Sequence, residues 1–266
     1  MPQRMRPLLG TFCTVSATVS AGDAQGAIEA AFAALAEVNI AAHPTREGSD
    51  LAALASHVGQ WRAIRRSTWE VLQLAGRIHR DSDGRFDPCL PDSEGRLADL
   101  QLADGECAAR LLKPARIDLG GIAKGFAVDQ AVDALRRHGC TGGSVNAGGD
   151  LRVFGPEPTV IQLRWAGGIA SSLPLQDAAV AVSERGSADK PAEFRGYYLR
   201  GCGASAAPEV QPAGSVHASG AMRADAAVVA PSAAVADALS TCAMICDDAL
   251  LTRLLQRWQA RLLQPR

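Results

Sequence analysis

Hydrophobic residues recur every three to four positions over residues 28–38, a spacing that predicts a helix with one apolar face. Ser20 or Asp23 could open this helix, because both residue types accept hydrogen bonds from the first N–H groups of a helix. A second apolar stripe begins after Ser67 and Glu70, which stand at the spacing of a capping box. We therefore expect a second helix that Ser67 caps.

The rest of the chain alternates short apolar runs with further stretches of helical spacing. Runs that are rich in Val and Ile and bounded by Gly, Pro or Ser are typical of strands. The strands predicted in this way are SVNAGGDLRVFG, TVIQLRW, AAVAVS and DAAVVA. Helical spacing returns before Gly139, after Ser232 and over residues 251–262. Residues 184–224 are rich in Gly, Ala, Pro and Ser, which predicts an irregular excursion.

Composition and charge narrow the classes of function. Of the 266 residues, 47% are hydrophobic and 21% are charged, as in an ordinary globular protein. The 27 Lys and Arg residues balance 28 Asp and Glu residues, so no overall field attracts nucleic acid or an anionic membrane. No apolar run has the length of a signal peptide or a membrane span, which favours a cytoplasmic protein, or a periplasmic one if a leader has been removed.

The stretch DLGGIAKGFAVD at residues 118–129 places glycines and a lysine at the start of a predicted helix. Gly120 and Gly121 allow the backbone to approach a ligand, and the helix start offers N–H groups that have no partner within the helix. Lys124 adds a positive charge at the positive end of the helix dipole, which is unfavourable unless an anion lies there. The turn therefore indicates a phosphate site, although a plain helix start with a solvated lysine explains it equally well.

A candidate metal site lies on the predicted helix PSAAVADALSTCAMI. Asp237 and Thr241 are four residues apart and share one helix face, among alanines that leave room for another group. A carboxylate and a hydroxyl are hard oxygen ligands, and Mg²⁺ takes only one or two protein side chains beside phosphate oxygens and water. The alternative is a solvated Asp237 and a threonine that bonds back to a helix carbonyl.

The stretch SVNAGGD supplies a third candidate. Asn146 precedes Gly148 and Gly149, which permit close backbone approach, and an asparagine amide can bond a base edge or a ribose. A hairpin turn explains the same residues about as well.

In chain order, five stretches resemble the FAD:protein FMN transferase family, also called the ApbE type. They are LLGTF (8–12), GRFDPCL (84–90), IDLGGIAKGFAVDQAVDAL (117–135), VNAGGDLRVFG (145–155) and VVAPSAAVADALST (228–241). The resemblance implies an α+β fold of two lobes, with mixed or antiparallel sheets flanked by helices and an FAD cleft between the lobes. We expect residues 1–266 to form a single domain of this kind.

The resemblance also implies an activity and its residues. Members of the family bind FAD and Mg²⁺, cleave the pyrophosphate, attach FMN to a threonine of an acceptor protein and release AMP. The metal ligands implied are the Gly121 carbonyl, Asp237 and Thr241. The residues expected to border the cofactor are Gly120, Gly121, Lys124, Asp129, Asn146, Gly148, Gly149 and Ser183. Lys124 and His217 are the catalytic candidates, with His217 as the base.

The chain departs from the family pattern at two places that bear on this assignment. The family segment close to HxxDPxxG corresponds here to SVHASGAMRADAAVVAP, in which His217 remains but the Asp-Pro pair is absent. An exposed loop histidine explains His217 about equally well. At AVSERGS, Ser183 keeps one hydroxyl while Glu184 and Arg185 replace the rest of a Thr-Ser-Gly turn.

Three functions therefore remain open. The first is Mg²⁺-dependent flavin transfer to a protein threonine. The second is FAD binding without transfer. The third is hydrolysis of FAD to FMN and AMP, with water in place of the threonine.

Overall fold

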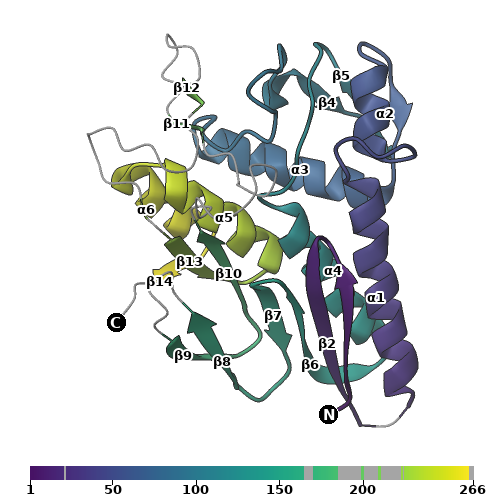
Figure 1. Cartoon of the computed structure of the whole chain (residues 1–266), viewed down its shortest axis with the longest axis vertical. Coiled ribbons are helices and arrows are strands. Elements are labelled where there is room, and N and C mark those ends of the chain that lie inside the picture. The colour runs from purple at the N-terminus through teal and green to yellow at the C-terminus, as the bar shows by residue number, and fades with distance from the viewer. Residues whose placement is uncertain are drawn as a thin grey trace.

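The structure is a computed structural model, and it describes residues 1–20, 22–164, 170–184, 199–200, 209–210, 223 and 225–263. A seven-stranded sheet in the order β1-β2-β6-β7-β10-β13-β14 forms its centre, and all neighbouring strands are antiparallel (Figure 1). These strands are β1 (Gln3–Leu8), β2 (Thr11–Val19), β6 (Cys140–Ala147), β7 (Asp150–Phe154), β10 (Ala179–Glu184), β13 (Asp225–Ala230) and β14 (Arg261–Leu263).

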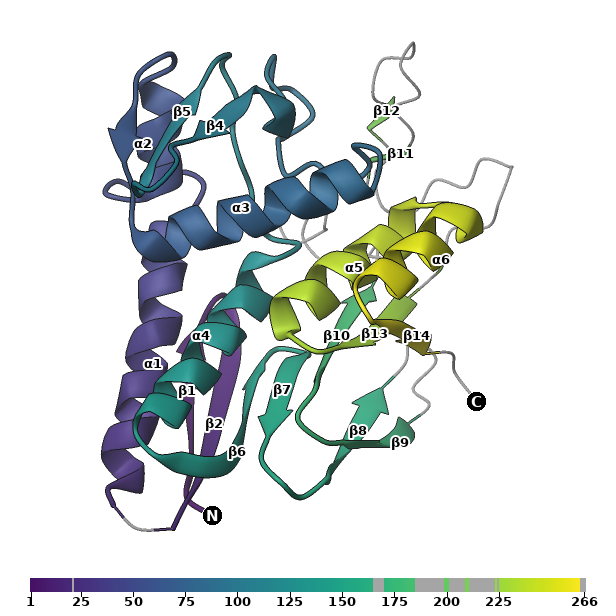
Figure 2. The same ribbon diagram turned by 180° about the vertical axis from the view of Figure 1, so that it is seen from behind.

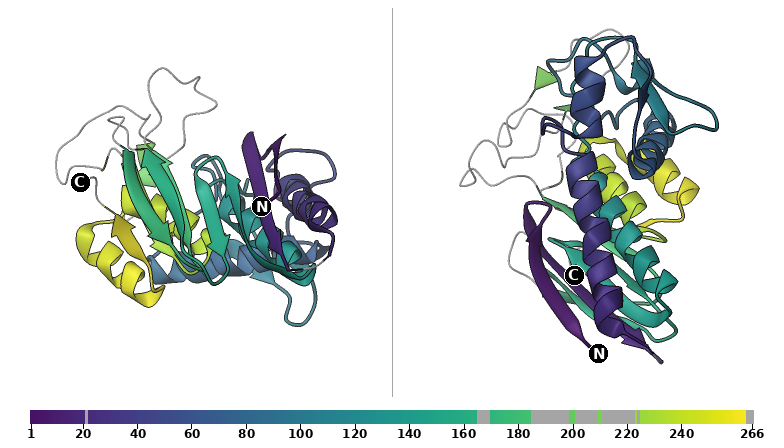
Figure 3. Two further views of the ribbon diagram at one scale, coloured as in Figure 1. Left: turned by 90° about the horizontal axis from the view of Figure 1, so that it is seen from below. Right: turned by 90° about the vertical axis from the view of Figure 1, so that its right-hand side faces the viewer.

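Helices cover one side of this sheet, as the views of Figure 3 show. They are α1 (Ala24–Ala41), α4 (Ala123–Arg137), α5 (Ala233–Ile245) and α6 (Asp248–Arg257). The hairpin of β8 (Thr159–Arg164) and β9 (Ala170–Leu175) packs on the other face. The period of two in a strand explains the division, because Ala179 and Ala181 join the helix-side core while Val180 joins the cluster beneath the hairpin.

A smaller group of elements lies at the far end of the molecule from the N-terminus (Figure 2). It consists of α2 (Asp50–Ser56), α3 (Arg66–Asp81), the 3₁₀ turn η1 (Leu97–Asp99), β3 (Arg62–Ala63), β4 (Leu100–Leu102) and β5 (Ala108–Leu111). The three strands form a sheet in the order β3-β5-β4. Its buried residues belong to the same continuous hydrophobic cluster as the helices of the large sheet. Two further short strands, β11 (Leu199–Arg200) and β12 (Glu209–Val210), pair with each other.

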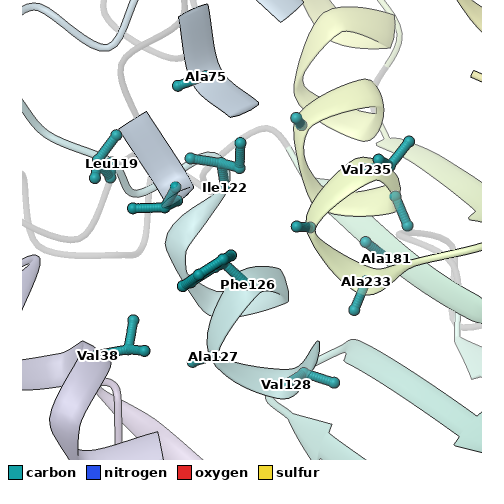
Figure 4. Close-up of a cluster of buried hydrophobic side chains, with 14 of the residues drawn as sticks. Val38, Ala75, Leu119, Ile122, Phe126, Ala127, Val128, Ala181, Ala233 and Val235 are labelled. Atoms are coloured by element: carbon teal, nitrogen blue, oxygen red, sulfur yellow. The ribbon is translucent and has the colours of Figure 1, made fainter. Parts of the chain in front are cut away.

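Helix α4 lies in the middle of the core and contacts α1 on one side and α5 on the other. Figure 4 shows Ile122, Phe126 and Val128 among the side chains of its neighbours. Gly125 permits the closest approach, since a side-chain carbon added there would lie 2.2 Å from the Ala233 carbonyl oxygen and 2.8 Å from Asp237 Cβ. The packing of α4 on α5 thus depends on a glycine one residue after Lys124.

Most of the predicted elements are confirmed. Helix α1 begins after Asp23, which occupies the N-cap position, and α4 ends just before Gly139, whose φ is +77°. Strands lie in all four of the Val- and Ile-rich runs. The α+β class with antiparallel sheets flanked by helices is also confirmed. Among the residues described, no helix is both long and apolar enough to cross a membrane.

Two predicted boundaries are wrong. Ser67 does not cap α3, because the helix begins at Arg66 and the Ser67 hydroxyl donates instead to Glu37 Oε1 at 2.9 Å. The last helix does not continue to Leu262, because α6 ends at Arg257 and the chain returns to pair with β13. In both cases a contact that is distant in sequence replaces the local pattern. Most of residues 184–224 lie outside the described residues.

Candidate functional site

A cavity of about 1470 Å³ is lined by segments that are far apart in the sequence. Its walls come from the β1–β2 turn, residues 85–91 after α3, the turn before α4, the β6–β7 turn, strands β8 and β10, and one face of α5. A cavity of this size exceeds the range of ordinary drug-sized sites and can hold a dinucleotide. If the prediction from the sequence is right, the expected cofactor residues should line this cavity.

The glycine turn before α4 touches the face of α5 that carries the predicted metal pair. A side-chain carbon added at Gly121 would lie 2.9 Å from Thr241 Oγ1, so any larger residue would crowd the hydroxyl. Asp237 lies one helical turn before Thr241, and all three residues line the cavity. The structure thus brings the three predicted metal ligands together. In the described part of the chain, no three His, Cys, Asp or Glu residues form a metal cluster.

Asp237 is held in place by the packing of the two helices. Its side chain is buried, with a residue exposure of 3%, and Oδ2 accepts a hydrogen bond of 3.0 Å from the Gly125 N–H. Burial raises the pKa of the Asp237 carboxyl, while the charge of Lys124 and the Gly125 N–H oppose that rise. A carboxylate in this position is costly to ionise without a nearby cation.

Lys124 is paired with a carboxylate that the sequence analysis did not single out. Its Nζ lies 2.5 Å from Oδ2 of Asp150, the first residue of β7, whose side chain is 2% exposed. The pKa of Asp150 is raised to about 7. Burial and then the charge of Asp237 raise it, and Lys124 opposes part of this rise. An anion thus already accompanies the lysine at this helix start, so its unfavourable place in the dipole does not by itself indicate a phosphate.

Asp129 does not line the cavity, contrary to the expectation that it borders the cofactor. Its two carboxylate oxygens accept the backbone N–H groups of Ala233 and Ala234, each at 2.9 Å, and Arg152 donates to it at 2.6 Å. These N–H groups open α5 and have no partner within the helix. Burial raises the pKa of Asp129, and Arg152 and the two N–H groups oppose the rise. Asp129 therefore fixes the start of the helix that carries Asp237.

The β6–β7 turn combines a structural role with a place on the cavity wall. Asn146 Oδ1 accepts from the Gly149 N–H at 3.1 Å, and Gly148 and Gly149 have φ values of +65° and +110°. A side-chain carbon at Gly148 would lie 2.5 Å from Thr11 Oγ1. The hairpin interpretation of SVNAGGD is therefore confirmed, since the turn needs these residues. All three also line the cavity, and their contact with a cofactor stays a prediction.

The remaining predicted residues are Gly120, Ser183 and His217. Gly120 lines the cavity, and its N–H donates to Asp118 Oδ1 at 2.9 Å. Ser183 also lines the cavity, with its hydroxyl 2.7 Å from that of Ser240. His217 lies outside the described residues.

These features define an α+β protein with a dinucleotide-sized cavity and an oxygen-rich corner between two helix segments. The sequence model of the ApbE family matches residues 9–93 and 92–262, so the chain belongs to the ApbE family. A search against curated proteins gave no match by sequence.

Solved ApbE structures share the fold. The ApbE protein from Thermotoga maritima has a TM-score of 0.77 at 21% identity, over 98% of this chain and 93% of that one. The flavinyl transferase ApbE from Pseudomonas stutzeri, in its apo form, has a TM-score of 0.75 at 19% identity, over 98% and 89%. The flavin transferase ApbE from Vibrio cholerae has a TM-score of 0.72 at 18% identity, over 98% and 92%.

Proposed function

We propose that this chain is a Mg²⁺-dependent flavin transferase that moves FMN from FAD to a threonine hydroxyl of an acceptor protein and releases AMP. The observation that carries the proposal is the meeting of Gly121, Asp237 and Thr241 at the wall of a cavity large enough for FAD. Membership of the ApbE family supports it, as do solved relatives that are flavin transferases.

The residues at this corner fit a magnesium ion. Asp237 offers a carboxylate of which one oxygen is engaged by the Gly125 N–H, and Thr241 offers a hydroxyl with no hydrogen bond to any other described residue. A backbone carbonyl at Gly121 would add a third hard oxygen without adding charge. Mg²⁺ prefers such oxygens and completes its shell with phosphate oxygens and water. When bound, the ion would neutralise charge on the phosphoryl group that is transferred.

The protein's own groups would prepare the cofactor for transfer. Lys124 lines the cavity with Asp237 and would add positive charge beside a bound pyrophosphate. Gly120 and Gly121 line the cavity just before α4, where they would let the backbone approach the phosphates. The bond between the threonine oxygen and the FMN phosphorus forms as the bond to the AMP oxygen breaks. The threonine proton passes to a base, for which His217 stays the prediction.

The test is to supply the purified chain with FAD, Mg²⁺ and a flavin-acceptor protein. We expect AMP release and flavin fluorescence that stays with the acceptor on a denaturing gel, both abolished by a chelator. AMP release that is equal without the acceptor would replace the proposal with FAD hydrolysis. Bound FAD without any AMP would replace it with a flavin-binding protein.

A further inference from the structure

Asp150 has no part in the proposed function, although it contacts a residue that does. It opens β7 behind the β6–β7 turn, with a side-chain exposure of 2%, and it is not among the residues that line the cavity. Its Oδ2 lies 2.5 Å from Lys124 Nζ, and the lysine side chain is 35% exposed at the cavity wall. The lysine thus connects a buried carboxylate to the cavity.

Three charges are therefore grouped at one corner. Asp150 and Asp237 are both buried acids that come from different elements. Lys124 pairs with Asp150, and Asp237 accepts the N–H of the next residue, Gly125. The charge of Asp237 contributes to the raised pKa of Asp150, after burial. If Asp150 were neutral, the full charge of the ammonium would act on Asp237.

We propose that Asp150 is a positioning residue that holds the Lys124 ammonium on the β7 side, so that Asp237 stays available to a divalent cation. This inference rests on the proposed function, because the cation is the one proposed there. Asp150 offsets the charge that would otherwise repel the cation from the Asp237 carboxylate. The lysine remains beside the cavity and can still face a phosphate.

If the ion pair of Lys124 and Asp150 had only a structural role, a different result would be expected. In that case Asp150→Asn and Lys124→Met would both lower stability and would leave Mg²⁺ affinity alone, or change it in the same direction. Under our proposal the two substitutions act oppositely on Mg²⁺. Asp150→Asn removes the negative charge that pairs with Lys124, whereas Lys124→Met removes a positive charge near Asp237.

The experiment is a calorimetric titration of Mg²⁺ into each variant, with saturating FAD and no acceptor protein. We expect Asp150→Asn to weaken Mg²⁺ binding by roughly ten-fold, the effect of about one pKa unit of electrostatic interaction. Lys124→Met should bind Mg²⁺ at least as tightly as the unaltered chain. The double variant should match Lys124→Met, because Asp150 acts through the lysine.

Asp177→Asn is the matched control, since Asp177 is a surface residue whose side chain is 60% exposed and pairs with Arg136. Circular dichroism of each variant shows whether it is folded. Mg²⁺ affinity of Asp150→Asn equal to that of the control would overturn the inference, as would a double variant clearly weaker than Lys124→Met. Absence of Mg²⁺ binding by the unaltered chain would instead overturn the proposed function, and the inference with it.

Discussion

Asp237 combines a structural contact with a place on the cavity wall in a single side chain. One of its oxygens accepts the Gly125 N–H, and the carboxylate still faces the cavity. The neighbouring Thr241 hydroxyl reaches the same corner because Gly121 has no side chain. The metal proposal therefore depends on the charge of Asp237 and on the absence of side chains at Gly121 and Gly125.

Asp237→Asn tests that charge directly. The amide oxygen can still accept the Gly125 N–H, so we expect the fold to persist, while Mg²⁺ affinity falls by about 100-fold or more because the anionic ligand is lost. Calorimetric titration of Mg²⁺ and a far-UV spectrum measure the two effects. The surface substitution Asp177→Asn serves again as the control. Unchanged Mg²⁺-dependent turnover in Asp237→Asn would refute the metal assignment.

The raised pKa of Asp150 predicts how stability depends on pH in the metal-free protein. The folded-state pKa is about 7, against an ordinary value of 3.8, so the folded protein binds more protons than the unfolded chain between these values. The free energy of unfolding should therefore fall as pH rises through this window, by at most ~1.4 kcal/mol per pH unit for this group, and level off above it. Asp237, whose pKa is also raised, acts with the same sign.

Urea unfolding in the presence of a chelator, at several values between about pH 5 and 8, measures this dependence. Asp150→Asn should show a clearly smaller slope than the unaltered chain, because the substituted residue does not titrate. An identical slope in the two proteins would show that Asp150 is already ionised in the folded state across this range.

The sequence predicted several site residues and misjudged the partners of two of them. Asp237 and Thr241 followed from their spacing on one helix face and Gly121 from the family resemblance, and the structure places the three together. The partner of Lys124 lies 26 positions away in sequence, and the N–H groups that Asp129 accepts lie 104 and 105 positions away. No local pattern predicts such pairings, because they depend on how β7 and α5 pack against α4.

The contact between α4 and α5 is the element-scale feature that sets the site. Gly125→Ala would place a carbon 2.2 Å from the Ala233 carbonyl oxygen, so the helices must separate. We expect a loss of about 1–3 kcal/mol in the free energy of unfolding, as for other overpacked positions, together with weaker Mg²⁺ binding. Denaturant unfolding and metal titration measure the two losses.

Gly76→Ala in α3 is the matched control for this substitution. A carbon added at Gly76 would meet only Arg80, at 3.7 Å, so it should stabilise the protein by roughly 0.5–1 kcal/mol through helix propensity. Equal stability changes for the two glycines would show that α4 and α5 are not in close contact.

The elements themselves were largely predictable from local patterns. Strands rich in Val and Ile are recognisable because alternate residues face two different cores, as Val180 and Ala181 do. The failure of the predicted cap at Ser67 could not be foreseen, because the Ser67 hydroxyl bonds to Glu37 in another helix. Local periodicity thus identifies an element, while its boundary depends on tertiary contacts.

At the scale of the whole molecule, the fold brings together segments that are separated by more than one hundred residues. The turn before α4, the face of α5 and the β6–β7 turn share one cavity, and the β1–β2 turn closes against Gly148. The fold class was predictable from the order of the family stretches. The volume of the cavity and the burial of Asp150 were not, because both arise only when the large sheet and its helices pack.

The central claim is that a divalent cation binds between Gly121, Asp237 and Thr241 and faces the phosphates of FAD. The most direct measurement is X-ray diffraction from crystals soaked with FAD and Mn²⁺, whose anomalous signal locates the ion. The account predicts a peak about 2.0–2.3 Å from the Asp237 carboxylate, with Thr241 Oγ and the Gly121 carbonyl as further ligands. An ion bound elsewhere, or FAD phosphates bound away from this corner, would contradict it.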